Sequence, residues 1–115
     1  MDTKRNRNNT RSEKIASKVQ TIVAEILRDK YSDDAILSGV SLVGAESHGG
    51  LQFVKIYFYS RSDANTTQTK LNAVSKNIRY ELGARMNQKY VPEIQFEYDD
   101  TMERAERIDN LLKNL

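Results

Sequence analysis

Residues 51–60 read LQFVKIYFYS and carry the clearest strand pattern of the chain. Apolar or aromatic side chains fill both alternating sets of positions, with Val54, Ile56 and Phe58 in one set and Phe53, Tyr57 and Tyr59 in the other. A period of two residues is the pattern of a β-strand. Because both sets are largely apolar or aromatic, we expect this strand to be central in its sheet, or to have its second face partly covered.

A long helix is predicted after this strand, over about residues 64–90. Its apolar stripe recurs at helical spacing and consists of Leu71, Val74, Ile78, Leu82 and Met86. Two features argue against a straight helix. Gly83 costs roughly 1 kcal/mol relative to Ala in a helix interior, and a straight axis would bring Arg85 and Lys89 onto the buried side. We therefore predict a helix–kink–helix that turns between residues 75 and 85 and ends before Pro92.

Two further strands are predicted around this pair of elements. Residues 94–98 alternate apolar and polar side chains, and their connection to residues 51–60 through a helix favours a parallel arrangement. Upstream, residues 36–46 predict a strand, which the tight turn Ser47-His-Gly-Gly50 joins to residues 51–60 as an antiparallel hairpin. The sequence thus predicts an α+β domain with a mixed three-stranded sheet and helices on one face.

The N-terminal segment is predicted to contain an arm and a helix. Residues 1–10 have no apolar side chain after Met1, so we expect a disordered basic arm. Thr10 and Glu13 have the spacing of a capping box, which predicts a helix over residues 11–30. The apolar stripe of this helix is Ile15, Val19, Ile22, Val23, Ile26 and Leu27.

The C-terminal segment predicts one more helix, with a stripe formed by Met102, Ala105, Ile108, Leu111, Leu112 and Leu115. Its acidic residues Glu103, Glu106 and Asp109 would repel RNA, so we expect this helix to pack on the core or to contact a protein partner. The chain is accordingly divided into the arm (1–10), a domain (11–98) and the C-terminal helix (99–115).

Composition excludes most kinds of catalytic and metal site. A chain of 115 residues with 38% hydrophobic residues is expected to form one domain. It has no cysteine and one histidine, which excludes disulfides, thiol catalysis and Cys-ligated zinc. It contains no phosphate-binding, metalloprotease or serine-hydrolase motif, so we expect neither an enzyme nor a cofactor. No apolar run approaches the roughly 18 residues of a membrane span and no signal peptide is recognised, so we expect a cytoplasmic protein without a membrane partner.

Three other groups of residues have a structural explanation that we prefer to a chemical one. His48 lies in the predicted turn and is expected to be an exposed spacer. The acidic pairs at residues 33–34 and 99–100 stand at element boundaries, where Asp caps helices or forms turns. The aromatic run at residues 57–59 could stack on RNA bases, but packing within the sheet explains it better.

Charge is segregated along the chain although its total is only +2. The balance of Lys and Arg over Asp and Glu is +4 for residues 1–30, −2 for 31–69, +4 for 70–91 and −4 for 92–115. Two basic blocks are typical of a surface that binds a polyanion, because Lys and Arg displace the counterions of phosphates. The alternative is a solvated helix face. The candidate RNA-binding residues are Lys4, Arg5, Arg7, Arg11, Lys14 and Lys18, and in the second block Lys70, Lys76, Arg79, Arg85 and Lys89, with Tyr80 facing outward beside them.

Several stretches carry a resemblance to a known family. They are Ile78–Met86 (IRYELGARM), Tyr90–Phe96 (YVPEIQF) and the pattern Asp100-x-x-Glu103-x-Ala105-x-Arg107-Ile108-x-x-Leu111-Leu112. Together with Arg11-x-x-Lys14-Ile15, Ala24-Glu-Ile-Leu27 and Val54-Lys55-Ile56-Tyr57, they closely resemble ribosome-binding factor A of bacteria and organelles over residues 11–113.

This resemblance implies both a fold and a function. The family has a type II KH-like fold of order α-β-β-α-kink-α-β, to which the helix over residues 99–115 is an addition. The family binds the small (30S) ribosomal subunit and its 16S rRNA during late maturation, is needed for 5′-end processing of that rRNA and for cold adaptation, and is not a nuclease. We therefore expect a monomeric assembly factor whose partners are free 30S subunits, 16S rRNA and assembly GTPases.

One position departs from the family pattern. The family has an Ala-x-Gly kink in place of the KH loop, whereas this chain has Val74-Ser75-Lys76 there. The resemblance implies an RNA contact at Ser75 and Lys76. The missing glycine predicts a milder kink, a hydrogen bond from Ser75 to the backbone, or a kink nearer to Gly83.

A rival hypothesis comes from the C-terminal stripe. In it, the chain is a protein-binding or dimerising KH-like adaptor that uses Leu111, Leu112 and Leu115 and makes no direct contact with rRNA. The basic residues would then serve solubility alone.

Overall fold

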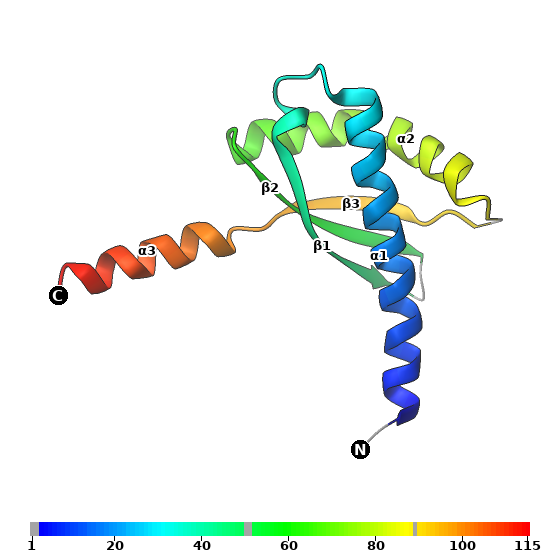
Figure 1. Cartoon of the computed structure of the whole chain (residues 1–115), viewed down its shortest axis with the longest axis horizontal. Helices are drawn as coiled ribbons and strands as arrows, with labels where there is room; N and C mark the ends of the chain where they lie inside the picture. Colours follow the sequence, from blue (N-terminus) through cyan, green and yellow to red (C-terminus); the bar gives the residue numbers. More distant parts are fainter. Residues whose placement is uncertain (1–2, 50–51, 89) are drawn as a thin grey trace.

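The fold is described by a computed structural model for residues 3–49, 52–88 and 90–115, with side chains from residue 11 onward. The elements follow in the order α1 (Thr3–Tyr31), a 3-10 turn η1 (Leu37–Gly39), β1 (Val40–His48), β2 (Phe53–Ser60), α2 (Ala64–Met86), β3 (Glu93–Tyr98) and α3 (Thr101–Lys113). In Figure 1, α1 and α2 lie against the sheet, whereas α3 extends away from it. The predicted α+β class with a mixed three-stranded sheet is confirmed.

The sheet has the order β1-β2-β3, so β2 is the central strand as predicted. β1 and β2 are antiparallel, and β2 and β3 are parallel, with Val54 opposite Ile94 and Phe58 opposite Tyr98. The register of β1 shifts between Leu42 and Gly44, where a β-bulge inserts one residue into the edge strand. The parallel pair requires a crossover, and α2 provides it.

The first hairpin differs from the prediction at both ends. We expected a strand from residue 36, but residues 37–39 form the turn η1. The carboxylate of Asp34 accepts hydrogen bonds from the backbone N–H groups of Ile36 and Leu37, both at 2.9 Å, and thereby holds this segment out of an extended conformation. At the other end, β1 continues to His48, and Gly49 takes the left-handed φ of +56° that the turn requires.

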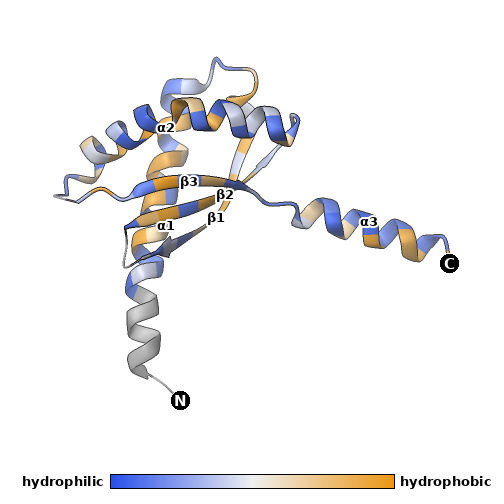
Figure 2. Cartoon of the chain, turned by 180° about the vertical axis from the view of Figure 1, so that it is seen from behind, coloured by the Kyte–Doolittle hydropathy of each residue, from blue (hydrophilic) through white to orange (hydrophobic). Residues whose placement is uncertain are grey.

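The core lies between one face of the sheet and the two helices α1 and α2. In β2 every second residue is fully buried, and Val54, Ile56 and Phe58 face the helices while the alternate residues are half-buried. From α1 and α2 the core receives Val19, Val23, Ile26, Leu71, Ile78 and Leu82. Figure 2 shows the apolar residues of α1 where this helix crosses the strands. The predicted stripes of both helices are therefore the ones that are buried.

α1 begins earlier than predicted. It starts at Thr3 rather than at residue 11, so most of the expected arm is a continuation of this helix. The capping-box spacing at Thr10 does not mark the helix start, because the preceding residues contain no Pro or Gly that would stop the hydrogen-bond ladder. The division into an arm, a domain and a C-terminal helix as functional parts stays a prediction. Within residues 3–49, 52–88 and 90–115, no helix is both long and apolar enough to cross a membrane.

α2 is a single α-helix with a well-defined cap at each end. The carboxylate of Asp63 accepts a hydrogen bond from Thr66 N–H at its start, and Asn87 ends it in the left-handed conformation, with φ of 52°. The helix therefore stops at Met86, before the predicted end near residue 90. In Figures 1 and 2 its second half slopes away from the direction of its first half. The bend that we expected is thus accommodated within a continuous helix.

α3 makes no part of the core. Every residue from 101 to 115 is exposed, and the helix has no buried residue. A hydrogen bond from Tyr98 Oη to Glu103 Oε1 at 2.6 Å links it to β3. Of the two expectations for α3, packing on the core is wrong, because α1 and α2 already cover the apolar face of the sheet, and contact with a protein partner stays a prediction.

Candidate nucleic-acid interface

The outward face of α2 and the segment at Val91 form a shallow groove that is open to solvent. Its volume is about 590 Å³, and its lining residues are Lys76, Arg79, Tyr80, Gly83, Ala84 and Val91. Val91 approaches α2 closely because Gly83 has no side chain, and a Cβ there would lie 3.1 Å from Val91 Cγ2. Tyr80 is 78% exposed, which confirms its predicted outward position.

Arg79 has a structural role beside this groove. Its Nε donates to Pro92 O at 3.3 Å and its Nη2 donates to Val91 O at 3.0 Å. Two hydrogen bonds from one guanidinium thus fix the segment that joins α2 to β3. We predicted Arg79 as a phosphate ligand, but these two groups are committed to the backbone.

Two further basic residues of α2 are neutralised by acidic partners. Arg85 Nη1 lies 3.0 Å from Asp29 Oδ2 of α1, and its Nε lies 3.5 Å from Glu81 Oε1. Lys70 Nζ lies 2.7 Å from Asp34 Oδ2, and this hydrogen bond, together with the one from Leu37 N–H, lowers the pKa of the Asp34 carboxyl below its usual value. Both cations join α2 to other parts of the fold, so a phosphate would have to compete with these partners.

A row of basic residues on α1 differs from Arg85 and Lys70 in having no acidic partner among the described side chains. Arg11, Lys14 and Lys18 are exposed, and their spacing places them on one side of the helix. Among the side chains that the structure describes, none of the three forms an ion pair. Of the predicted RNA-binding residues whose side chains the structure describes, this row and Lys76 on α2 are the cations without a contact that would compete with phosphate oxygens.

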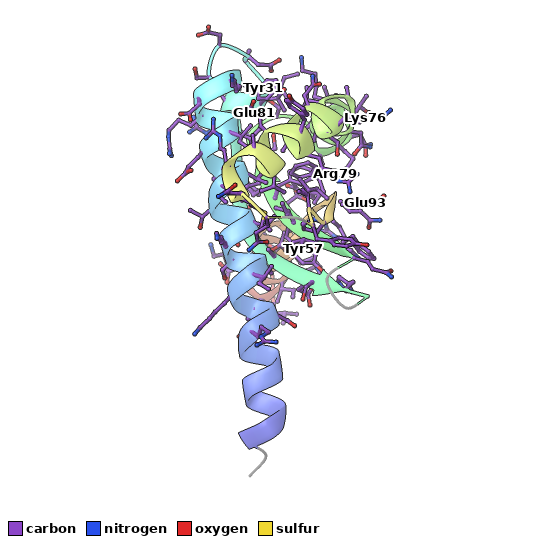
Figure 3. The ribbon with its side chains drawn as sticks, turned by 90° about the vertical axis from the view of Figure 1, so that its right-hand side faces the viewer. Tyr31, Tyr57, Lys76, Arg79, Glu81 and Glu93 are labelled. Carbon is purple, nitrogen blue, oxygen red and sulfur yellow. The ribbon has the colours of Figure 1, made fainter. Side chains whose placement is uncertain are left out.

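The two groups of cations lie at different places on the molecule. The row on α1 precedes Tyr31 by 13 residues or more, which corresponds to roughly 20 Å along a helix. Tyr31, in contrast, shares a depression with Tyr80 on α2. Figure 3 shows Tyr31, Lys76 and Arg79 all in the part of the molecule opposite the N-terminal end of α1. The fold therefore does not merge the predicted residues into a single patch.

The remaining candidates are only partly described. Lys4, Arg5 and Arg7 belong to the first turns of α1, where the side chains lie outside the described part, and Lys89 itself lies outside the described residues. Ser75 is half-buried, and within residues 11–49, 52–88 and 90–115 its hydroxyl has no recorded hydrogen bond to the backbone. The assignment of an RNA contact to these residues stays a prediction.

The histidine, the acidic pairs and the aromatic run noted in the sequence have structural roles. His48 is not an exposed spacer: it ends β1, its ring stacks on Phe53 at 5.1 Å, and its Nε2 is buried without a hydrogen-bond partner in the described part of the chain. The turn role predicted for the acidic pairs is confirmed at Asp34, as described above, and at Asp99, whose carboxylate accepts from Thr101 N–H at 2.9 Å. Phe58 packs in the core as predicted.

Sequence reasoning missed Ala84 and Val91 as parts of the groove. Ala84 lies four residues after Tyr80, so helical periodicity could have placed it on this face. Val91 follows the end of the helix, and no periodic pattern relates it to Lys76. The available signal was Gly83, since a glycine inside a helix often marks a close approach of another chain segment.

The whole sequence was compared with known families, and one of them matches most of its length. The sequence model of the family described as ribosome-binding factor A matches residues 11–112. The chain belongs to the ribosome-binding factor A family. Ribosome-binding factor A from Limosilactobacillus fermentum is 38% identical over 109 residues, which cover 91% of this chain and 90% of that protein. The family is described by what it binds, which agrees with our prediction that the chain is not an enzyme.

Solved structures of ribosome-binding factor A share the fold. The crystal structure of the factor from Thermus thermophilus superposes with a TM-score of 0.68 at 11% identity, covering 76% of this chain and 94% of that one. A homology model of the Thermus thermophilus factor, fitted into a cryo-EM map of a complex with 30S, gives a TM-score of 0.61 at 11% identity, covering 73% and 90% of the two chains. The element order of this chain is therefore the family order, with the KH-like arrangement predicted from the sequence.

Proposed function

We propose that this protein is an assembly factor that binds the small (30S) ribosomal subunit through phosphates of its 16S rRNA. Membership of the ribosome-binding factor A family supports a ribosomal partner, and the relative from Thermus thermophilus is described in a complex with 30S. The observation that carries the proposal for this chain is the row Arg11, Lys14 and Lys18 on α1, which is exposed and free of acidic partners among the described side chains.

The proposed contact is electrostatic. Each cation that replaces a condensed counterion contributes to affinity for any RNA sequence and makes binding dependent on salt. Lys76 supplies a second point of contact on α2, while Arg79 and Arg85 hold the shape of that surface through Val91 and Asp29. The row on α1 would therefore contribute affinity, and the surface of α2 would recognise the shape of the RNA.

The finer parts of the proposal come from the family resemblance. We place the action of this factor late in maturation of the subunit, in the cytoplasm, where it holds the rRNA in an immature conformation until release. Loss of the factor is then expected to impair 5′-end processing of the 16S rRNA precursor and growth in the cold. Assembly GTPases are candidates for the release step, and the factor acts as a monomer.

Cosedimentation with purified 30S subunits over a salt series tests this proposal. The variant Arg11→Gln, Lys14→Gln, Lys18→Gln removes three cations, so the slope of log K against log salt is expected to become shallower by roughly 2 to 3. A matched control, Arg104→Gln, Arg107→Gln, Lys113→Gln, removes three exposed cations from α3 and is expected to leave the slope unchanged. Equal slopes for the wild type and the α1 variant would contradict the proposal.

A second function has one observation in its favour. Leu111 and Leu112 on α3 and Leu115 just after its end are all exposed, as a protein-binding or dimerising adaptor without direct rRNA contact would require. This alternative predicts that binding to 30S does not depend on salt and is lost when the chain ends after Asp100. Salt-dependent binding that persists in the shortened chain would exclude it.

A further inference from the structure

We propose that the groove between α2 and the segment at Val91 holds one unpaired base of the bound RNA, stacked on Tyr80. This inference rests on the proposed function and names the feature of RNA that the α2 surface recognises. It distinguishes α2 from the row on α1, whose cations contact phosphates regardless of whether the RNA is single- or double-stranded.

The chemistry of the groove fits a base with its phosphate. Tyr80 presents an exposed aromatic ring, Gly83, Ala84 and Val91 supply an apolar surface, and Lys76 supplies a positive charge at the same site. Aromatic side chains that stack on splayed bases, next to cations that hold the backbone, are the usual means of binding single-stranded RNA. Among the described residues, none that lines the groove is acidic and would repel the phosphate.

The groove is also held open by the fold. Arg79 fixes the far wall through Val91 O and Pro92 O, so this wall does not depend on the ligand. Gly83 lets Val91 pack directly against α2 as part of this wall, since a methyl group at residue 83 would lie 3.1 Å from Val91 Cγ2. The groove is shallow and open to solvent, and its volume of about 590 Å³ leaves room for one base lying against Tyr80.

A peptide is a poorer occupant of the same groove. A peptide that binds as an added β-strand gains much of its affinity from hydrogen bonds to backbone groups of its receptor. The described walls are poorly suited to such bonds, because one wall is a helix and the carbonyl groups of the other already accept from Arg79. A base needs only the face of an aromatic ring, which Tyr80 provides.

Fluorescence anisotropy with two labelled RNAs tests the proposal: a short single strand of mixed sequence and the same sequence as a blunt duplex. Tyr80→Ala is expected to weaken single-strand binding by roughly 5- to 150-fold, the effect of losing one base–aromatic stack, and to leave duplex binding unchanged. Tyr80→Phe is expected to retain binding of both. Tyr90→Ala removes a tyrosine that is 85% exposed but does not line the groove, and it is the matched control.

A second variant tests the groove itself. Gly83→Ala introduces a methyl group against Val91 and is expected to weaken single-strand binding while duplex binding and the circular dichroism spectrum stay as in the wild type. The inference is overturned if Tyr80→Ala binds the single strand as tightly as the wild type, or if Tyr90→Ala loses as much as Tyr80→Ala does.

The failure of this inference can be distinguished from failure of the proposed function. If the triple α1 variant weakens 30S binding but Tyr80→Ala leaves the single strand unaffected, only the base site is wrong. If the α1 variant has no effect, the phosphate contact is wrong. A photo-crosslinking amino acid at position 80 decides between occupants on the 30S subunit: a crosslink to rRNA supports the base site, and a crosslink to a ribosomal protein alone overturns it.

Discussion

α1 and α3 carry the same kind of apolar stripe and lie in opposite environments. Ile26 and Val23 of α1 are 0% exposed, whereas Ile108 and Leu112 of α3 are 58% and 61% exposed. Both helices are amphipathic in sequence, and both were predicted from the spacing of their apolar residues. The difference shows that the spacing predicts where a helix is apolar, but not whether the chain supplies something to cover that face.

In the part of the chain that the structure describes, one face of the sheet is buried beneath helices, and α1 and α2 cover it. α3 leaves β3 through residues Asp99 and Asp100, which bind the first turn of the helix: Asp99 accepts from Thr101 N–H, and Asp100 Oδ1 lies 3.0 Å from Arg104 Nε. These contacts set the start of α3 without any apolar packing. The helix is thus anchored by polar groups alone.

The largest expected difference in unfolding free energy is between truncations of equivalent residues in the two stripes. Ile26→Ala leaves a cavity in the core and is expected to lower the free energy of unfolding by about 2–5 kcal/mol. Ile108→Ala removes the same atoms from an exposed position and is expected to change it by less than about 0.5 kcal/mol. Urea unfolding followed by circular dichroism measures both. Similar losses for the two variants would mean that α3 packs against apolar surface in solution.

A smaller loss of unfolding free energy is expected when a threonine hydroxyl near the start of α2 is removed. Thr67 is 0% exposed, and its Oγ1 donates to Asp63 O at 2.9 Å. Ser60 Oγ, 2.8 Å away, must therefore be the donor in the Ser60–Thr67 pair. Thr67→Val leaves this buried donor without an acceptor and is expected to cost about 1–3 kcal/mol of unfolding free energy.

The matched change on the other helix is Thr101→Val. Thr101 is exposed, so water replaces the hydrogen bond of its hydroxyl to Asp99, and the unfolding free energy is expected to change by less than about 0.5 kcal/mol. Thermal unfolding of both variants at neutral pH checks the contrast. A loss at Thr101 as large as that at Thr67 would show that the start of α3 is buried.

The smallest expected effect on stability comes from two tyrosines, each of which donates a hydrogen bond to a glutamate carboxylate. Hydrogen bonds to Glu46 and Glu103, with burial, raise the pKa of Tyr57 and Tyr98 respectively to about 12. A raised tyrosine pKa means that the neutral phenol is favoured in the folded state. The contacts therefore stabilise the fold fully below pH 10 and lose this contribution as the pH rises towards 12.

Ending the chain after Asp100 separates the two tyrosines. Removal of Glu103 is expected to lower the pKa of Tyr98 towards its ordinary value of 10, while the pKa of Tyr57 stays near 12. An NMR titration of tyrosines labelled with ¹³C at the ζ carbon measures each pKa. Glu103→Gln in the full chain is the control, and an unchanged Tyr98 in both variants would contradict the contact between α3 and β3.

The β2-α2-β3 unit was the part of the fold that the sequence predicted best. The stripe of α2 and the alternation of β2 and β3 are long and regular, and the handedness of crossovers leaves few arrangements for them. The starts of α1 and β1 were predicted wrongly because one local signal competed with another. The capping box at Thr10 lies inside a helix that nothing stops, and the Asp34 carboxylate draws residues 36–37 into a turn.

In the candidate site, the sequence predicted the direction of side chains but not their distant partners. The helical wheel placed Tyr80 outward, and this holds because the direction of a side chain on a helix follows from its position. The partners of Arg79 and Arg85 were not predictable in this way. Pro92 lies 13 residues from Arg79 and Asp29 lies 56 residues from Arg85, so only the assembled fold brings them together.

The bulge in β1 has a consequence for self-association. A three-stranded sheet has two edges, and a long flat edge is a template on which further chains can add strands. On one side, the register shift between Leu42 and Gly44 interrupts the flat edge of β1. On the other, β3 is only six residues long, follows Pro92, and carries Glu93 and Glu97 at exposed positions. Both edges are thereby poor templates, which protects against fibrillar aggregation while the exposed side chains remain open to partners.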